Sequence, residues 1–148
     1  MKTTFFSLSV LTVSLFFSTT NSFAQKKEKD KVLVKKIYTV EFTETGVKKP
    51  KPVSDEINFN GEKMSSKFMS SENGFQASPY TVTVDSSASP KTIAFEVLGK
   101  NSDSEELKLN GTITGDAVEG TATVTRKGKT KHEYTFSGNL KEKPGKKK

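Results

Sequence analysis

The segment from Glu106 to Leu140 constrains the fold more than any other part of the chain, because it reads as three successive antiparallel strands. Taking Gly115-Asp116 as a two-residue hairpin loop pairs Ile113 with Val118, Gly111 with Gly120, Leu109 with Ala122 and Leu107 with Val124. All of these residues are apolar or small and fall on one face. A slip of one residue would turn every side chain to the other face, so the pattern supports this register.

The second hairpin of this meander is predicted to turn at Arg126-Lys127-Gly128, a three-residue loop with glycine in the left-handed position. This loop pairs Ala122 with His132, Gly120 with Tyr134 and Val118 with Phe136. Neighbouring glycines at 111 and 120 leave a gap in the inner face. We expect the Tyr134 ring to fill it, as aromatic rings do over strand glycines, although a ligand could use the same gap.

Alternation of apolar and polar residues predicts eight strands, at about 37–43, 53–59, 62–69, 80–85, 92–99, 106–114, 117–125 and 129–138. Asn60-Gly61 indicates a type I′ turn, which places Asp55 opposite Ser66 and Ile57 opposite Met64. No segment shows a helical period. Eight antiparallel strands, each with one apolar face, predict an all-β, up-and-down barrel of lipocalin-like shape, because closure removes both exposed edges. A two-sheet β-sandwich is the alternative.

Residues 1–24 have the pattern of a secretory signal peptide: Lys2, an apolar stretch over 5–17, and a small-x-small site at Ser22-Phe23-Ala24. The apolar stretch is shorter than the ~20 residues of a membrane span. We therefore expect an exported protein, periplasmic or secreted, that does not span the membrane. Since the chain has no cysteine, neither a disulfide nor a lipid anchor on cysteine is expected.

The predicted domains after the signal are a basic leader at 25–36, the barrel at 37–140 and a disordered basic tail at 141–148. Val32 to Val34 could begin a strand within the leader. The formal net charge is +7, but the lysines gather in 26–36, 48–51 and 141–148, which leaves the patterned body mildly acidic. Lys48, Lys49 and Lys51 are therefore candidates for contact with an anionic surface polymer or a protein; solubilisation is the other interpretation of such clusters.

Two partner classes are excluded by the pattern. Nucleic acid is not expected, because the basic clusters lack interleaved aromatic residues and the body is acidic. An outer-membrane barrel is not expected either, because the outward strand positions are Thr, Lys, Glu and Asn, where lipid contact demands an apolar band.

His132 is the only histidine, and the predicted register places it inward near the barrel rim. Without a cysteine or a second histidine, a common zinc site is not expected, and we predict no catalytic residue, metal or cofactor. A rim or packing role for His132 is favoured. Asp55 lies on the apolar face, where it would anchor the polar end of a ligand, unless a bulge turns it outward. Glu105 and Glu106 are expected to face solvent.

The interior of an eight-stranded barrel is either just filled by side chains or holds one small ligand. Phe75, in the connection over 70–79, is predicted to be a lid over one end of the sheet or a hydrophobic plug. The candidate ligand-lining residues are Asp55, Phe59, Phe68, Phe75, Tyr80, Phe95, His132, Tyr134 and Phe136.

Gly74-Phe75 before the Tyr80 strand, and the closing meander from Gly111 to Gly138, resemble a group of short secreted bacterial barrel proteins of unknown role. The chain as a whole resembles the calycin barrels, the architecture of lipocalins and fatty-acid-binding proteins. It has no tryptophan, so the Gly-x-Trp of the first lipocalin strand is absent. The resemblance implies a barrel and carries over no ligand, since a fold has no function by itself.

These observations predict an exported, non-enzymatic and monomeric β-barrel that binds a small apolar ligand or has a filled interior and uses its surface. The alternative is a binding module for a protein or an anionic glycan, acting through the basic loop and tails.

Overall fold

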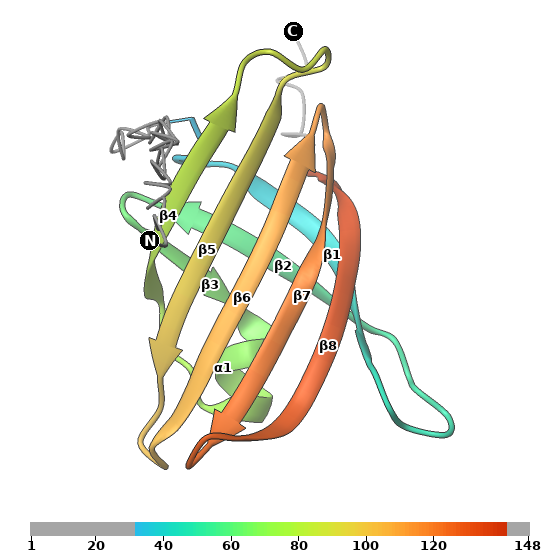
Figure 1. Ribbon diagram of the computed structural model, residues 1–148, viewed down its shortest axis with the longest axis vertical. Coiled ribbons are helices and arrows are strands. Elements are labelled where there is room, and N and C mark those ends of the chain that lie inside the picture. The colour runs from blue at the N-terminus through green and yellow to red at the C-terminus, as the bar shows by residue number, and fades with distance from the viewer. Residues whose placement is uncertain (1–31, 142–148) are drawn as a thin grey trace, which may run out of the picture.

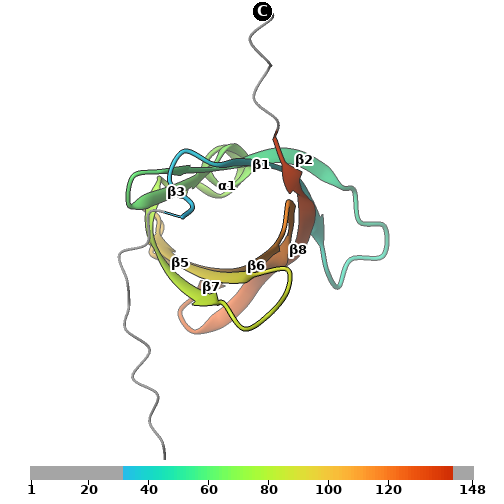
Figure 2. The same cartoon turned by 90° about the horizontal axis from the view of Figure 1, so that it is seen from above.

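The computed structural model describes residues 32–141, which form a closed antiparallel barrel with one short helix. Each strand pairs with the next along the chain, and β8 closes the barrel against β1. Figures 1 and 2 show the ring of strands from the side and from above. The elements are β1 (Ile37–Glu44), β2 (Val53–Asn60), β3 (Lys63–Ser66), α1 (Lys67–Asn73), β4 (Ser78–Asp85), β5 (Thr92–Lys100), β6 (Glu105–Thr114), β7 (Ala117–Arg126) and β8 (Lys129–Leu140).

The predicted barrel is therefore confirmed, and the β-sandwich alternative is wrong. The register predicted for β6 and β7 is also confirmed, from Ile113 opposite Val118 to Leu107 opposite Val124. The predicted signal peptide at 1–24 and the predicted tail beyond Lys141 lie outside the described residues, and so does most of the predicted leader.

The register predicted for β7 and β8 is wrong by two residues. Tyr134 pairs with Ala122 and Phe136 with Gly120, because the loop contains only Lys127 and Gly128. Both loop residues have positive φ, 50° and 75°, as a tight type I′ turn requires. A bulge after Val124 absorbs one residue of β8. Because the error is an even number of residues, the predicted inner face of the last strand is still the observed one.

The segment predicted as a strand over 62–69 is instead a four-residue strand, β3, followed by helix α1. Ser66 ends β3 and caps the helix, since its hydroxyl accepts a hydrogen bond from the Met69 amide. Gly74 ends the helix in the left-handed conformation, φ 69°. The β2–β3 turn lies one residue later than predicted, so Phe59 pairs with Met64 and Ile57 with Ser66.

The barrel interior is packed with apolar side chains from every strand. Phe59 is fully buried in it, and its ring centroid lies 5.1 Å from that of Phe95, 5.0 Å from that of Tyr80 and 6.2 Å from that of Tyr38. The expectation that Tyr134 fills the gap at the strand glycines is wrong. Phe95 lies against Gly111, and Phe136 lies against Gly120.

The two ends of the barrel are closed differently. At one end, residues 32–36 form a turn rather than a strand, and Leu33 is fully buried. The amide of Lys35 donates to the Phe59 carbonyl, which holds this turn against β2. Helix α1 lies at the other end (Figure 1). Phe75, which follows this helix, is buried in the core cluster and therefore acts as a hydrophobic plug.

Candidate functional site

A cleft of about 530 Å³ lies at the α1 end of the barrel, outside the packed interior. Its walls come from α1, from the loop over 45–52 that joins β1 to β2, and from the start of β8. This loop projects from the barrel in Figures 1 and 2. The cleft is lined by Phe42, Glu44, Val47, Lys49, Pro50, Lys51, Val53, Phe68, Glu72, Asn73, His132 and Tyr134.

The floor of this helix-end cleft is aromatic. The Phe68 ring lies 5.2 Å from that of Phe42 and 5.3 Å, edge to face, from that of Tyr134. Burial is the main cause that raises the pKa of Tyr134, and the nearby Glu44 and Glu72 charges raise it further. The Tyr134 hydroxyl is therefore neutral at physiological pH and adds no charge to the floor.

The rim of the cleft exposes apolar side chains to solvent. Val47 is 43% exposed and Val53 is 38% exposed. Within residues 32–141 the only other large hydrophobic side chain with such exposure is Leu98, on β5. Exposed apolar area gathered at a concave site is typical of a place that a partner molecule covers.

Lys49 and Lys51 add two positive charges to the rim. Neither side chain forms a hydrogen bond or ion pair with another residue between 32 and 141. Glu72, from α1, is the carboxylate on the opposite side that likewise has no partner in this range. The cleft thus combines an apolar interior with free charges at its edge.

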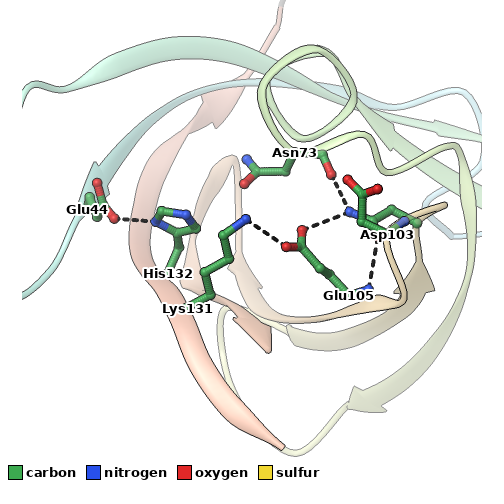
Figure 3. A network of polar contacts seen from close by, with 7 residues as sticks. Glu44, Asn73, Asp103, Glu105, Lys131 and His132 are labelled. Atoms are coloured by element: carbon green, nitrogen blue, oxygen red, sulfur yellow. Dashed lines mark hydrogen bonds and ion pairs between the residues drawn. The ribbon is translucent and has the colours of Figure 1, made fainter. Parts of the chain in front are cut away.

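His132 and Glu44 form the polar contact at the base of the loop. His132 Nδ1 lies 2.7 Å from a Glu44 carboxylate oxygen, and the imidazole stacks on Tyr134 at 6.0 Å. Figure 3 shows the two side chains meeting from β1 and β8. The carboxylate requires a proton on Nδ1, so Glu44 fixes the tautomer and holds the ring in place. The predicted rim position of His132 agrees with this placement.

A second polar network binds the last residue of α1, Asn73 (Figure 3). Asn101 Nδ2 donates both to the Asn73 carbonyl at the end of α1, at 2.8 Å, and to Glu105, at 2.9 Å. Lys131 Nζ donates to the other oxygen of Glu105 at 2.6 Å. The hydrogen bond from Lys131 is the main cause that holds the pKa of Glu105 below its usual range, and the bond from Asn101 lowers it further. Glu105 is only 3% exposed, so the expectation that it faces solvent is wrong; Glu106 is exposed as expected.

The structure brings five of the candidate residues together in the cleft: Phe68, His132, Tyr134, Lys49 and Lys51. Lys48 lies on the same loop but does not line the cleft. The other aromatic candidates, Phe59, Phe75, Phe95 and Phe136, are buried in the barrel core, and Tyr80 packs against it. These five rings build the fold, and none of them contributes to the cleft.

Asp55 faces inward, so the expected bulge that would turn it outward is absent from β2. It is not free to anchor a ligand. One carboxylate oxygen accepts hydrogen bonds from the Ser66 hydroxyl, at 2.5 Å, and from the Phe68 amide, at 3.1 Å. Asp55 thus satisfies donors at the first turn of α1, and it shares no hydrogen bond with His132.

Sequence reasoning missed Val47, Val53, Glu44 and Glu72 as cleft residues. Val47 carried a usable signal, because it is the one apolar side chain among the charges and prolines of Gly46 to Pro52. The others depend on α1 and on the path of the loop, neither of which the strand pattern predicts.

Comparisons of the chain with protein-family models, with curated proteins and with solved structures find no match. Within residues 32–141, no group of three or more His, Cys, Asp or Glu side chains is placed to hold a metal ion. The single short helix of this part of the chain falls well below the length and apolarity needed to cross a membrane.

Proposed function

We propose that this protein is an exported, non-enzymatic binding protein and that its helix-end cleft takes a small amphipathic anion. The observation that carries the proposal is the pairing of exposed Val47 and Val53 with the free ammonium groups of Lys49 and Lys51 on one rim. A calycin-like resemblance and a predicted signal peptide are consistent with such a role. The ligand would bind outside the barrel core, at its mouth.

The apolar side chains of the floor and rim indicate that the ligand also has an apolar part. A volume of about 530 Å³ is within the range that small-molecule sites occupy. An apolar body that covers the two valines and rests on Phe68 would remove exposed hydrocarbon from water, which is worth about 25 cal/mol per Å².

The charged side chains at the rim of the cleft indicate that the ligand carries an acidic group. Lys49 and Lys51 have no partner within residues 32–141, whereas Glu44 already holds His132. An anionic headgroup at the loop side would meet the two lysines and stay away from Glu72 on α1. The unpaired carboxylate therefore orients the ligand, with its headgroup toward the loop.

Two features favour binding over catalysis. The chain has no cysteine, and its sole histidine is engaged by Glu44 and stacked on Tyr134. Nothing in the lining set of the cleft provides a serine or threonine hydroxyl as a nucleophile beside this imidazole.

A second candidate function is contact with an anionic glycan or protein through the whole basic loop. The exposure of Lys48, which does not line the cleft, favours it. In this case all three loop lysines would contribute alike, and binding would weaken steeply with salt.

Titration calorimetry with decanoate, decanol and a sulfated oligosaccharide separates these functions. We expect saturable decanoate binding that the Lys49→Gln/Lys51→Gln variant weakens about tenfold, since two exposed ion pairs contribute about 1.4 kcal/mol together. Lys48→Gln is the matched control and should leave decanoate affinity unchanged. Decanol affinity should respond to neither variant.

Absence of saturable decanoate binding at millimolar ligand would refute the proposal. Tight oligosaccharide binding that each lysine substitution reduces equally would establish the second candidate instead.

A further inference from the structure

We infer that a groove on the outer face of the barrel is a docking surface for an extended, lysine- or arginine-rich segment of a partner polypeptide. This outer groove has a volume of about 730 Å³ and crosses the strands from β4 to β1. The inference does not depend on the helix-end cleft.

The walls of the outer groove are two rows of outward side chains set by the sheet register. One row joins Glu96, Asn110, Thr121, Thr135 and Thr43 across five neighbouring strands. The other joins Thr83, Ala94, Thr112, Glu119, Ser137 and Glu41. Each row therefore runs at right angles to the strands.

The floor between the rows is the line of strand positions whose side chains point inward. Gly111 and Gly120 pair in the middle of this line, with Phe95 and Phe136 beside them. The two rings lie against the glycines inside the barrel, where a Cβ at either position would meet them. The outer side of this line therefore presents backbone, on which an extended chain could lie.

The charge of the outer groove is complementary to a cationic partner. Glu41 and Glu119 form no hydrogen bond or ion pair with any residue in the range 32–141, and both are exposed. Glu96 is paired with Lys108 at 3.3 Å, through side chains that are 40% and 58% exposed. An exposed pair of this kind contributes little and is readily exchanged.

The positions of the carboxylates indicate an extended chain. The groove has a carboxylate on every second strand: Glu41 on β1, Glu119 on β7 and Glu96 on β5. Neighbouring strands are ~4.8 Å apart, so successive carboxylates are separated by ~10 Å across the sheet. A polyproline II helix rises ~3.1 Å per residue and repeats every third residue, so a basic residue at every third position matches this spacing.

The remaining wall side chains suit a polypeptide backbone. Thr, Ser and Asn side chains both donate and accept hydrogen bonds, as the N–H and C=O groups of an extended chain require. The two aromatic rings of the lining set, Phe95 and Phe136, are buried at 3% exposure each. They present no exposed face on which a sugar ring could stack, which favours a peptide over a glycan in this groove.

Fluorescence anisotropy with a labelled Lys-Pro-Pro triple repeat tests the inference. We expect saturable binding to wild type at low salt. The affinity of the Glu41→Gln/Glu96→Gln/Glu119→Gln variant should be at least tenfold lower. The matched control Asp103→Asn/Glu106→Gln/Asp116→Asn removes the same charge outside the groove and should bind within twofold of wild type. A peptide of the same composition with its three lysines in one block should bind at least fivefold more weakly.

Thr121→Arg provides a second variant, because it fills the groove wall and keeps all three carboxylates. It should also weaken binding at least tenfold while circular dichroism reports an unchanged melting temperature. Equal losses in the groove and control variants, equal affinity for the two peptides, or no saturable binding to wild type would each overturn the inference.

Discussion

Asp55 offers the sharpest test of the structure, because its carboxylate links β2 to the start of α1. The Ser66 hydroxyl donates to Asp55 and accepts from the Met69 amide at 3.1 Å, while the Phe68 amide donates to the same carboxylate oxygen. Replacing Asp55 with alanine removes the acceptor for two donors, and the residue is only 8% exposed.

The magnitude follows from these two bonds. A hydrogen bond to a charged group contributes about 1.5–3 kcal/mol, and a donor left unsatisfied in the interior adds to the loss. Because the Phe68 amide is only partly buried, we expect Asp55→Ala to lower the unfolding free energy by about 3 kcal/mol. Ser66→Ala removes the cap and one of the two bonds and should cost about 2 kcal/mol.

Urea denaturation of wild type, Asp55→Ala, Ser66→Ala and the double variant measures these values. We expect the double variant to lose about 1 kcal/mol less than the sum of the single losses, because both variants break the same bond. If Asp55→Ala stays within 0.5 kcal/mol of wild type, the carboxylate has no role in capping. If it keeps full stability but abolishes decanoate binding, Asp55 is a ligand anchor after all.

Two further predictions concern buried polar groups. The Tyr38 hydroxyl has no hydrogen-bond partner within residues 32–141, so Tyr38→Phe should raise the unfolding free energy by about 1 kcal/mol. Burial, with a smaller contribution from Asp116, raises the pKa of Tyr38 to about 12, so wild type should also lose stability relative to the variant as pH rises above about 10, measured by urea denaturation. The depressed pKa of Glu105 contributes stability that is present above the pKa of an unfolded glutamate, about 4.3, and is lost as pH falls through the folded value. The melting temperature of Glu105→Gln should therefore lie below that of wild type at pH 7, and the difference should become smaller toward pH 3. A difference that stays constant over this range would contradict the prediction.

The apolar alternation of the strands was sufficient to predict the barrel, and its limits explain the errors. The inner face repeats every two residues, so a register wrong by two residues satisfies the same pattern. This is why the pattern predicts Tyr134 opposite Gly120, where Phe136 lies. Only the turn residues distinguish the two registers, and the positive φ of Lys127 is unusual for a residue other than glycine.

The strand pattern also failed to predict helix α1, for a related reason. Met64, Ser66 and Phe68 alternate in a way that fits a strand, and seven residues are too few to show a helical period. The signals that could have identified the helix are at its ends, where Ser66 is a good N-cap and Gly74 a good C-terminal stop. The strand pattern still identifies three cleft residues as candidates, because it predicts inward positions for Phe68, His132 and Tyr134.

The packed interior explains why both proposed binding surfaces lie outside it. Phe59 and its neighbouring rings fill the barrel interior, and a ligand there would have to displace side chains on which the fold depends. A filled barrel is instead rigid, and it holds loops and sheet positions at fixed distances. The helix-end cleft depends on that rigidity because Glu44 and His132 join β1 to β8 at the base of the 45–52 loop. The outer groove depends on it to keep its two rows of side chains, with Glu41 and Glu119 in one and Glu96 in the other, at a fixed separation.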